Sequence, residues 1–159
     1  MSDLIEGQTA PALDLPTDDG GRFDLAAATG PVVVFFYPKA DTPGCTTEAS
    51  DFSALKPEFD KLGVSVVGVS RDPVKKLARF RAKHELGVVL ASDEDGVVTE
   101  AWGVWVEKQL YGRKYMGVER ATVLVATDGT VARVWRKVSV KGHAAEVLEA
   151  ARNTNQIRA

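Results

Sequence analysis

The sequence of 159 residues contains a single cysteine, and it lacks any long uninterrupted run of apolar residues. One cysteine cannot form a disulfide within the chain, so disulfides do not hold the fold, and a free thiol persists most readily in a reducing compartment. No segment approaches the ~20 apolar residues needed to cross a bilayer. The first residues, Met1 to Pro11, lack the basic region and apolar stretch of a secretory signal. We therefore expect a cytoplasmic protein that does not enter a membrane.

An excess of charge of one sign is also missing. The formal net charge is -2, with 20 basic and 22 acidic residues, and no run of five like charges occurs, so nothing indicates binding to nucleic acid or to an anionic membrane. No Gly-x-Gly-x-x-Gly loop follows a strand, which removes the dinucleotide interpretation. His84 and His143 lie far apart with no cysteine or carboxylate at ligand spacing. We expect a small-molecule substrate, no metal and no cofactor.

The composition fits one folded unit. With 45% hydrophobic residues, the chain is long enough for one well-filled core and short for two. We expect a single domain over residues 1–159, with a tail at 153–159 that frays because it has little apolar surface to bury. Since the pattern contains no long uncovered edge strand or apolar patch, we expect a monomer.

Apolar runs and turn signals predict alternating strands and helices. Buried strands are expected at 31–37, 64–69 and 121–126, and a short strand at 88–90. Helices are expected from about 42, over 73–86 and over 141–152, with a brief helical turn within 93–102. Turn residues predict an N-terminal β-hairpin around Asp18-Asp19-Gly20-Gly21 and a second hairpin around Asp128-Gly129 that ends in a partly exposed strand at 131–138.

These elements predict an α/β fold with a central mixed β-sheet flanked by helices. The strand, helix and strand over 31–69 form a βαβ unit, whose right-handed crossover makes the two strands parallel. Pro57 lies inside the first helical pattern and should kink that helix or begin a second segment, because proline lacks a donor and clashes one turn back.

Three clusters have simpler interpretations than binding sites. The acidic run Asp93-Glu94-Asp95 suits a helix start better than a calcium loop. The basic face of the helix over 73–86 is typical of a solvated surface, with a docking patch for a reducing partner as the alternative; its residues are Lys75, Lys76, Arg79, Arg81 and Lys83. The aromatic residues that follow are expected to cover the core or to line a pocket mouth for apolar peroxides; they are Trp102, Trp105, Tyr111 and Tyr115.

The chemistry is expected where the first buried strand meets the first helix. If Thr42 is the N-cap, Pro43 takes the first helical position and Cys45 falls in the first turn. Unpaired N–H groups and the positive end of the helix dipole favour an anion there, and such positions lower the pKa of a thiol.

The cysteine has a plain alternative, because a lone cysteine is more often a small, inert, buried residue. Its place at the carboxyl end of a strand and the start of a helix, a preferred location for ligands in open α/β sheets, favours function instead.

The pattern Pro38-x-x-x-Thr42-x-x-Cys45 resembles the active-site signature of the peroxiredoxins, thiol peroxidases with a thioredoxin-like fold. The fuller run from Tyr37 to Thr46 is similar to the bacterioferritin-comigratory, or Q, group. Three further runs match in order along most of the chain: Gly7-x-x-Ala10-Pro11-x-Leu13-x-Leu15, Gly68-Val69-Ser70-Arg71-Asp72 and Glu119-Arg120-x-Thr122. The resemblance implies reduction of hydrogen peroxide and organic hydroperoxides through a sulfenic acid on Cys45.

The resemblance also implies roles for neighbouring residues. Thr42 would hydrogen-bond the peroxide, Arg120 would hold the thiolate and polarise the oxygens, and Pro38 would shield the sulfur from water. Each has an alternative: Thr42 as a plain N-cap, Pro38 as a strand terminator, and Arg120 as half of a surface ion pair with Glu119. Glu48, one turn after Cys45, either orients the arginine or simply complements the helix dipole.

One departure from the Q group concerns the reductant. Many members place a resolving cysteine five residues after the first, where this chain has Ser50. We therefore expect a one-cysteine mechanism, in which an outside thiol such as glutathione, glutaredoxin or thioredoxin reduces the sulfenic acid, or in which Cys45 pairs with that of another chain.

Two other classes of function compete with the peroxidase. A thioredoxin-like thiol-disulfide oxidoreductase would share the fold, but it normally needs a Cys-x-x-Cys motif, which is missing here. A non-catalytic binding or holdase protein would make the cysteine incidental and would be unaffected by Cys45→Ser.

Overall fold

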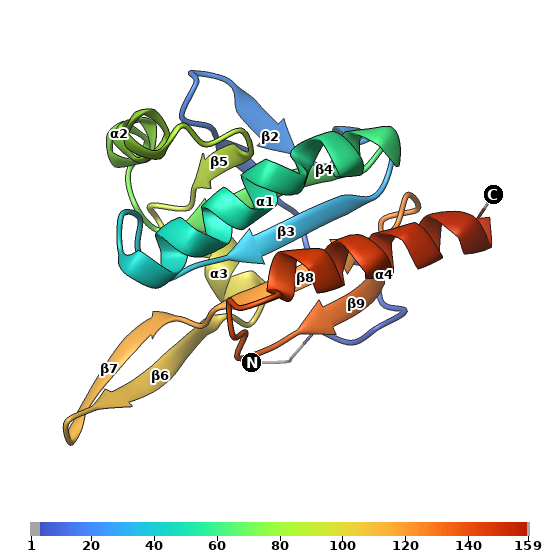
Figure 1. The fold of residues 1–159 in the computed structure, drawn as a ribbon. Coiled ribbons are helices and arrows are strands. Elements are labelled where there is room, and N and C mark those ends of the chain that lie inside the picture. Colours follow the sequence, from blue (N-terminus) through green and yellow to red (C-terminus); the bar gives the residue numbers. More distant parts are fainter. Residues whose placement is uncertain (1–3, 159) are drawn as a thin grey trace.

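The computed structural model describes residues 4–158, and a five-stranded mixed sheet forms its centre (Figure 1). In the order β5-β4-β3-β8-β9, its strands are β5 (Val89–Ser92), β4 (Ser65–Ser70), β3 (Val32–Phe36), β8 (Ala121–Val125) and β9 (Val131–Trp135). β3 pairs parallel with β4 and antiparallel with β8. The three predicted buried strands, the predicted short strand at β5, the parallel βαβ unit and the mixed sheet are confirmed.

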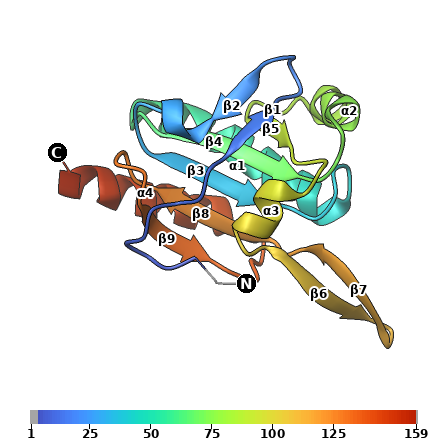
Figure 2. The same cartoon turned by 180° about the vertical axis from the view of Figure 1, so that it is seen from behind.

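Helices cover both faces of this sheet. They are α1 (Pro43–Lys61), α2 (Val74–His84), α3 (Val97–Ala101) and α4 (His143–Arg158), together with a short 3-10 turn, η1 (Leu25–Ala27). α1 and α4 lie side by side across one face of the sheet (Figure 1), and α3 lies on the other face, as the reverse view shows (Figure 2). No helix among residues 4–158 is long and apolar enough to cross a membrane.

The core is split by the sheet into two layers, as the alternation of side chains along a strand requires. Along β3 and the residue after it, Val33, Phe35 and Tyr37 point into the layer beneath α1, α2 and α4. Val32, Val34 and Phe36 point into the opposite layer, where Trp102 is fully buried. Because β3 is buried on both faces, it is a rigid central support for the loop that follows it.

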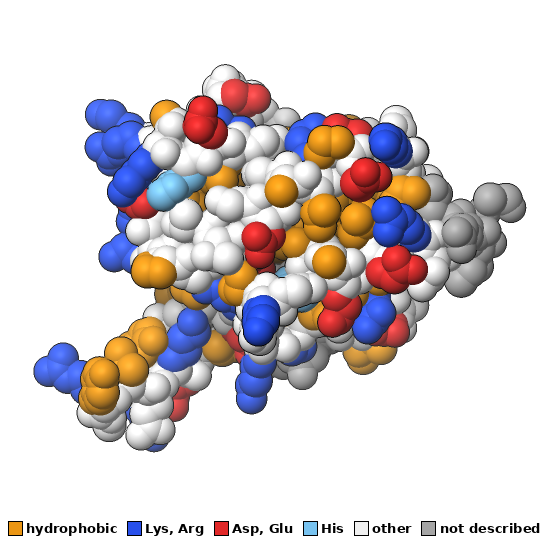
Figure 3. Space-filling view, in the orientation of Figure 1, with side chains coloured by type: hydrophobic (Ala, Val, Ile, Leu, Met, Phe, Trp, Pro, Cys, Tyr) orange, Lys and Arg blue, Asp and Glu red, His pale blue; other side chains and the backbone are white. Residues whose placement is uncertain are grey.

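Two antiparallel hairpins flank the central sheet. The N-terminal hairpin, β1 (Asp14–Pro16) with β2 (Arg22–Asp24), is the one predicted. The other, β6 (Trp105–Leu110) with β7 (Arg113–Val118), was not predicted, and it projects from the body beside the start of α1 (Figure 1). Its tip exposes apolar side chains (Figure 3); they are Leu110, Tyr111, Tyr115 and Met116. The expectation that the aromatic residues cover the core is therefore wrong for Tyr111, which is 96% exposed.

Two helix predictions differ from the structure. α1 continues through Pro57 to Lys61 as one helix, so the prediction of a second helical segment is wrong. α4 extends to Arg158, whereas the sequence predicted an end near residue 152 and fraying at 153–159. Residue 159 lies outside the described part of the chain.

The acidic run forms a helix start, as predicted. The Asp93 carboxylate accepts the amides of Val98 and Thr99 at 3.1 and 2.7 Å, which caps α3.

Candidate active site

Cys45 lies in the first turn of α1, just after the chain leaves the carboxyl end of β3. Thr42 is the N-cap, with extended backbone angles, and Pro43 takes the first helical position, as the sequence predicted. The Thr42 hydroxyl does not cap the helix; it donates to the Lys39 carbonyl at 2.7 Å. Because its proton is used in this bond, the oxygen lone pairs of Thr42 remain available to accept a hydrogen bond from a ligand.

The Cys45 thiol is buried, with 1% of the residue exposed, and its main polar contact is Arg120. Arg120 comes from the short link between β7 and β8, 75 residues along the chain, and its Nη2 lies 3.3 Å from Sγ. Gly44 makes room for this contact, since a Cβ at that position would lie 3.1 Å from the same nitrogen. The tertiary fold therefore brings a fixed positive charge to the sulfur.

Glu48 anchors the other side of the guanidinium. It lies one turn after Cys45 on α1, and its Oε1 accepts from Arg120 Nη1 at 2.7 Å. Its second carboxyl oxygen is buried without a hydrogen-bond partner. Burial raises the pKa of Glu48 to about 7, against the opposing attraction of Arg120. Burial alone would lower the pKa of Arg120, but the Glu48 carboxylate and the Cys45 thiol together raise it.

The alternative interpretation of Arg120 as a partner of Glu119 is wrong. Glu119 pairs with Arg136 at 2.6 Å, which leaves Arg120 turned toward Cys45 and Glu48. The structure thus brings together three of the residues singled out from the sequence, Cys45, Arg120 and Glu48, with Thr42 at the start of the same helix. Pro38 is half-buried after the end of β3, where it lines a neighbouring cleft.

Two carboxylates hold the loop between β3 and α1, residues 37–42, called the catalytic loop below; neither was assigned a place in the site from the sequence. Asp72 accepts the Ala40 amide at 2.8 Å. Asp41 has a left-handed backbone with φ 64°, and its carboxylate contacts His84 Nε2 at 2.8 Å and Lys83 Nζ at 3.0 Å. Asp72 lies in a run that matched the peroxiredoxins, which was the one available signal; the contacts of Asp41 join residues more than 40 positions apart and leave no local pattern.

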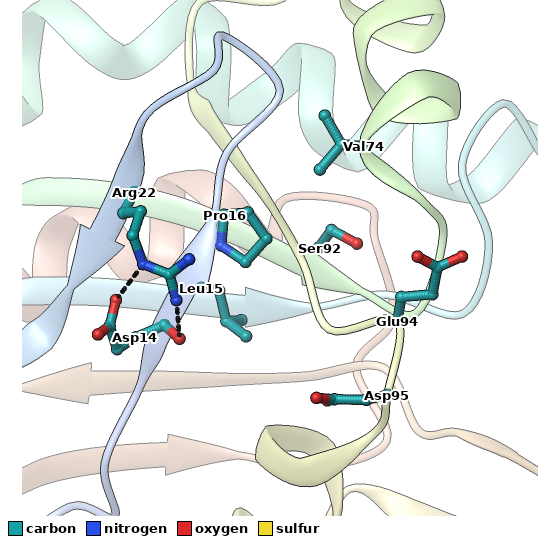
Figure 4. A pocket seen from close by; sticks show the side chains of 8 residues that line it. All are labelled: Asp14, Leu15, Pro16, Arg22, Val74, Ser92, Glu94 and Asp95. Carbon is teal, nitrogen blue, oxygen red and sulfur yellow. Dashed lines mark hydrogen bonds and ion pairs between the residues drawn. The ribbon is translucent and has the colours of Figure 1, made fainter.

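Two of the clefts in the structure differ in their position relative to the site residues. One, of about 420 Å³, lies between Pro38 and Lys39 of the catalytic loop and the β6–β7 hairpin. The other, of about 450 Å³, lies between the β1–β2 hairpin, the start of α2 and the loop after β5 (Figure 4). In the second cleft Arg22 is bonded to Asp14, and none of Cys45, Thr42, Arg120, Pro38 or Glu48 lines it. Of these two, the first cleft adjoins the catalytic loop. A further cleft of about 390 Å³, between Asp41 and α2, touches the other side of that loop.

This arrangement suits attack by sulfur on a polarised bond. The Arg120 guanidinium lies against the sulfur, where it can stabilise negative charge that develops on a departing oxygen. Within residues 4–158 no group of three or more His, Cys, Asp or Glu side chains is arranged to hold a metal ion.

Comparison with known proteins agrees with this chemistry. Residues 6–134 match the AhpC/TSA family. A putative peroxiredoxin Bcp of Coxiella burnetii is 46% identical over 143 residues, which cover 89% of this chain and 95% of that protein. Peroxiredoxin Bcp of Xanthomonas campestris is 46% identical over 153 residues, which cover 94% and 96% of the two chains.

A solved structure extends the likeness to the fold. The bacterioferritin comigratory protein of Xanthomonas campestris, studied for its alkyl peroxide reduction activity, superposes with a TM-score of 0.88 at 43% identity and covers 95% of this chain and 99% of its own. The fold is thus the thioredoxin-like α/β fold of the peroxiredoxins, and the sequence similarity extends over nearly its whole length. The chain belongs to the AhpC/TSA family and is a peroxiredoxin, an enzyme that reduces peroxides with a cysteine thiol.

Proposed function

We propose that this peroxidase works by a one-cysteine mechanism centred on Cys45, with Arg120, Thr42, Pro38 and Glu48 as its partners. The observation that carries the proposal is the Arg120 guanidinium, which bridges Cys45 Sγ at 3.3 Å and the Glu48 carboxylate at 2.7 Å. Hydrogen peroxide and organic hydroperoxides are the proposed substrates. The alkyl peroxide reduction of the Xanthomonas relative supports the second group.

In the first step the Cys45 thiolate attacks one peroxide oxygen. The S–O bond forms as the O–O bond breaks, and the departing oxygen leaves as water or an alcohol after taking a proton. Arg120 is placed to stabilise the charge on the oxygens, and the Thr42 hydroxyl, whose proton already goes to Lys39, accepts from the peroxide O–H. Pro38 limits the access of water to the sulfur.

Ionisation of the thiol cannot supply the whole rate. A thiol of pKa ~8.5 is already a few per cent thiolate at pH ~7, so full ionisation gains only about 30-fold, or ~2 kcal/mol, less the nucleophilicity lost as the pKa falls. Any larger acceleration must come from contacts made in the transition state, which is the part assigned to Arg120 and Thr42.

The second step needs a thiol from outside the chain. Cys45 is the single cysteine of the sequence, so its sulfenic acid has no internal partner, and glutathione, glutaredoxin or thioredoxin must supply the thiol. The same fact opposes the thiol-disulfide oxidoreductase alternative, which needs two cysteines in one site. We place the enzyme in the cytoplasm, where such thiols are abundant.

The deciding experiment measures the second-order rate constant for the reaction of hydrogen peroxide with the reduced protein. Cys45 sulfenic acid is followed with a trapping reagent and intact mass, against Cys45→Ser and free cysteine. A rate at least about a thousandfold above free cysteine corresponds to ~4 kcal/mol of transition-state stabilisation and supports the proposal. A rate equal to that of a free thiol would contradict the peroxidase proposal and would favour the interpretation as a non-catalytic binding protein.

A further inference from the structure

The cleft between the catalytic loop and the β6–β7 hairpin is lined by three cations from three different parts of the chain. Lys39 follows β3, Arg71 follows β4, and Lys108 lies on β6. Among the described residues, none of the three forms an ion pair with a carboxylate. The carboxylate that lines the cleft, Asp72, is already engaged, since it pairs with Lys76 at 3.2 Å and accepts the Ala40 amide. The cleft therefore carries positive charge that is not taken up in ion pairs within residues 4–158.

In the described part of the chain, the contacts that hold Arg71 are all with neutral groups. Its guanidinium carbon lies 3.4 Å from the centroid of the Trp105 ring, and its Nε donates to Thr99 Oγ1 at 2.9 Å. A second bond runs from Nη2 to the Gly96 carbonyl at 3.3 Å. These contacts fix the orientation of the charge without cancelling it, which is what a site for an anion needs.

Lys108 links the cleft to the reactive centre. Its side chain is half-buried in the cleft wall. Desolvation lowers the pKa of Lys108 and Arg120 lowers it further, whereas Cys45 and the Glu119 carboxylate act in the opposite direction. The carbonyl of Lys39, another residue of the cleft wall, accepts the Thr42 hydroxyl at 2.7 Å, so the cleft adjoins the start of the helix that carries Cys45.

The remaining walls of the cleft are apolar, and its volume suits a small molecule. Pro38, Trp105, Met116 and Val118 supply these surfaces. A volume of about 420 Å³ lies within the ~300–1,000 Å³ typical of small-ligand sites. The chemistry of the cleft therefore fits a small organic anion with one or more carboxylates.

We propose that this cleft binds the reductant, and that the reductant is a low-molecular-weight thiol bearing carboxylates. This inference rests on the proposed one-cysteine function, because that mechanism requires a thiol from outside the chain. Lys39, Arg71 and Lys108 bind the carboxylates, and the thiol is directed toward Cys45.

The reaction balances with two equivalents of this thiol. The first thiolate attacks the sulfenic sulfur of Cys45, an S–S bond forms, and the hydroxyl leaves as water after taking a proton. The second attacks the ligand's own sulfur in the mixed disulfide, which releases the Cys45 thiolate and a disulfide of the reductant. The sulfenic acid is reduced and two thiols are oxidised.

The test compares thiols that differ in charge on the same sulfenic acid. Cys45 is oxidised with one equivalent of hydrogen peroxide, and its reduction by glutathione, by glutathione diethyl ester and by 2-mercaptoethanol is followed by stopped flow. The variants are Lys39→Gln and Lys108→Gln. Lys114→Gln is the matched control, since Lys114 lies on the same hairpin, is exposed, and does not line the cleft. Arg71 is left intact because it also bonds Gly96 and Thr99.

We expect glutathione to react at least about tenfold faster than its diester at low ionic strength, with the advantage shrinking from about 20 to about 200 mM salt. Lys39→Gln and Lys108→Gln should each reduce this ratio about threefold or more, and Lys114→Gln should leave it unchanged.

Equal rates for glutathione and its diester would overturn the inference. The inference would also be wrong if Lys114→Gln lowered the ratio of the glutathione rate to the diester rate as much as Lys108→Gln does. It would be wrong, too, if thioredoxin reduced the sulfenic acid at least about tenfold faster than glutathione and the Lys39→Gln and Lys108→Gln variants left that rate unchanged. If instead the two variants slow oxidation by a carboxylate-bearing hydroperoxide and spare the thiol step, the cleft serves the peroxide and the inference is wrong. The rate of the oxidation step is measured separately, so failure of the peroxidase proposal is distinguishable from failure of this one.

Discussion

Arg120 and Glu48 form a buried ion pair that ends against the sulfur of Cys45. The guanidinium donates from Nη1 to the carboxylate and from Nη2 to the sulfur, so its planar fork sets the angle between the two contacts. An unsatisfied Glu48 oxygen on the far side of this pair costs stability. At the scale of single residues, the site therefore gives up some stability to fix a charge beside the thiol.

Arg120→Lys tests whether the planar guanidinium, which contacts Glu48 and Cys45 at once, is needed for the reaction. A lysine carries the same charge as a compact ammonium and cannot bridge two atoms in the same way. We expect the second-order rate with hydrogen peroxide to fall about 100-fold or more, or ~3 kcal/mol. Arg133→Lys, on β9 over the Trp135 ring, is the control and should keep the rate. A fall of less than about threefold in Arg120→Lys would show that charge alone suffices.

Glu48→Gln tests whether the buried carboxyl of Glu48 makes the stability of the protein depend on pH. Burial raises its pKa from 4.5 to about 7 in the folded protein, so between these values the folded state holds a proton that the unfolded state has lost. The contribution of Glu48 to stability therefore falls as pH rises through this window, by about 3 kcal/mol.

Urea unfolding at about pH 5 and about pH 8 checks this prediction. The free energy of unfolding of Glu48→Gln relative to the unsubstituted protein should rise between the two pH values. Glu58→Gln, at a more exposed position of the same helix, controls for the loss of a carboxylate in general. A relative stability of Glu48→Gln that does not change with pH would contradict the raised pKa.

At the scale of elements, the continuous helix α1 keeps Cys45 apart from any partner on its own helix. Ser50, where many members of the Q group have the resolving cysteine, lies five residues later in the same helix, about 7.5 Å further along its axis. Disulfides need Cα atoms about 4.4–6.8 Å apart, so the folded helix is too rigid to close such a bond without unwinding.

Ser50→Cys makes this testable. We expect hydrogen peroxide to produce an internal disulfide between Cys45 and the introduced thiol more slowly than it produces the sulfenic acid, together with a loss of far-UV circular dichroism at helical wavelengths. Ser53→Cys, eight residues from Cys45 on the same helix, should form no such bond. A disulfide that forms with the helical signal intact would refute the requirement for unwinding.

At the scale of the whole molecule, burial of Cys45 bears on self-association. With 1% of the residue exposed, a disulfide between two copies would need both buried sulfur atoms to be uncovered at once before they could approach to ~2.05 Å. The exposed apolar residues at the tip of the β6–β7 hairpin are the other surface on which copies could meet (Figure 3).

We predict that the protein is a monomer when reduced and stays one after oxidation. Peroxide without thiol should convert Cys45 to sulfinic acid rather than to a Cys45-linked dimer. Light scattering after size exclusion and a non-reducing gel check both statements. A dimer of the reduced protein that Tyr111→Ser converts to monomer would contradict the prediction for the reduced state. A dimer band after oxidation that is absent in Cys45→Ser would contradict the prediction for the oxidised state.

The local features of the fold and site were predictable because short-range physics produces them. The continuous apolar run of β3, the N-cap at Thr42 and the first-turn position of Cys45 each depend on neighbours within a few residues. The β6–β7 hairpin was missed because it is held by strand pairing and is largely exposed, so no core imposes a hydrophobic period on it. The length of α4 was missed because its last turns are mostly polar in sequence and give little apolar signal.

By itself, then, the sequence determined that one thiol lies at the start of a helix after a doubly buried strand, and that no second thiol is available within the chain. The tertiary structure decided what surrounds that thiol. Arg120 reaches Cys45 from 75 residues away, its pairing with Glu48 rather than Glu119 depends on how β8 lies beside β3, and the cations of the cleft come from three separate parts of the chain. Such contacts depend on strand order and packing, which no local pattern of residues encodes.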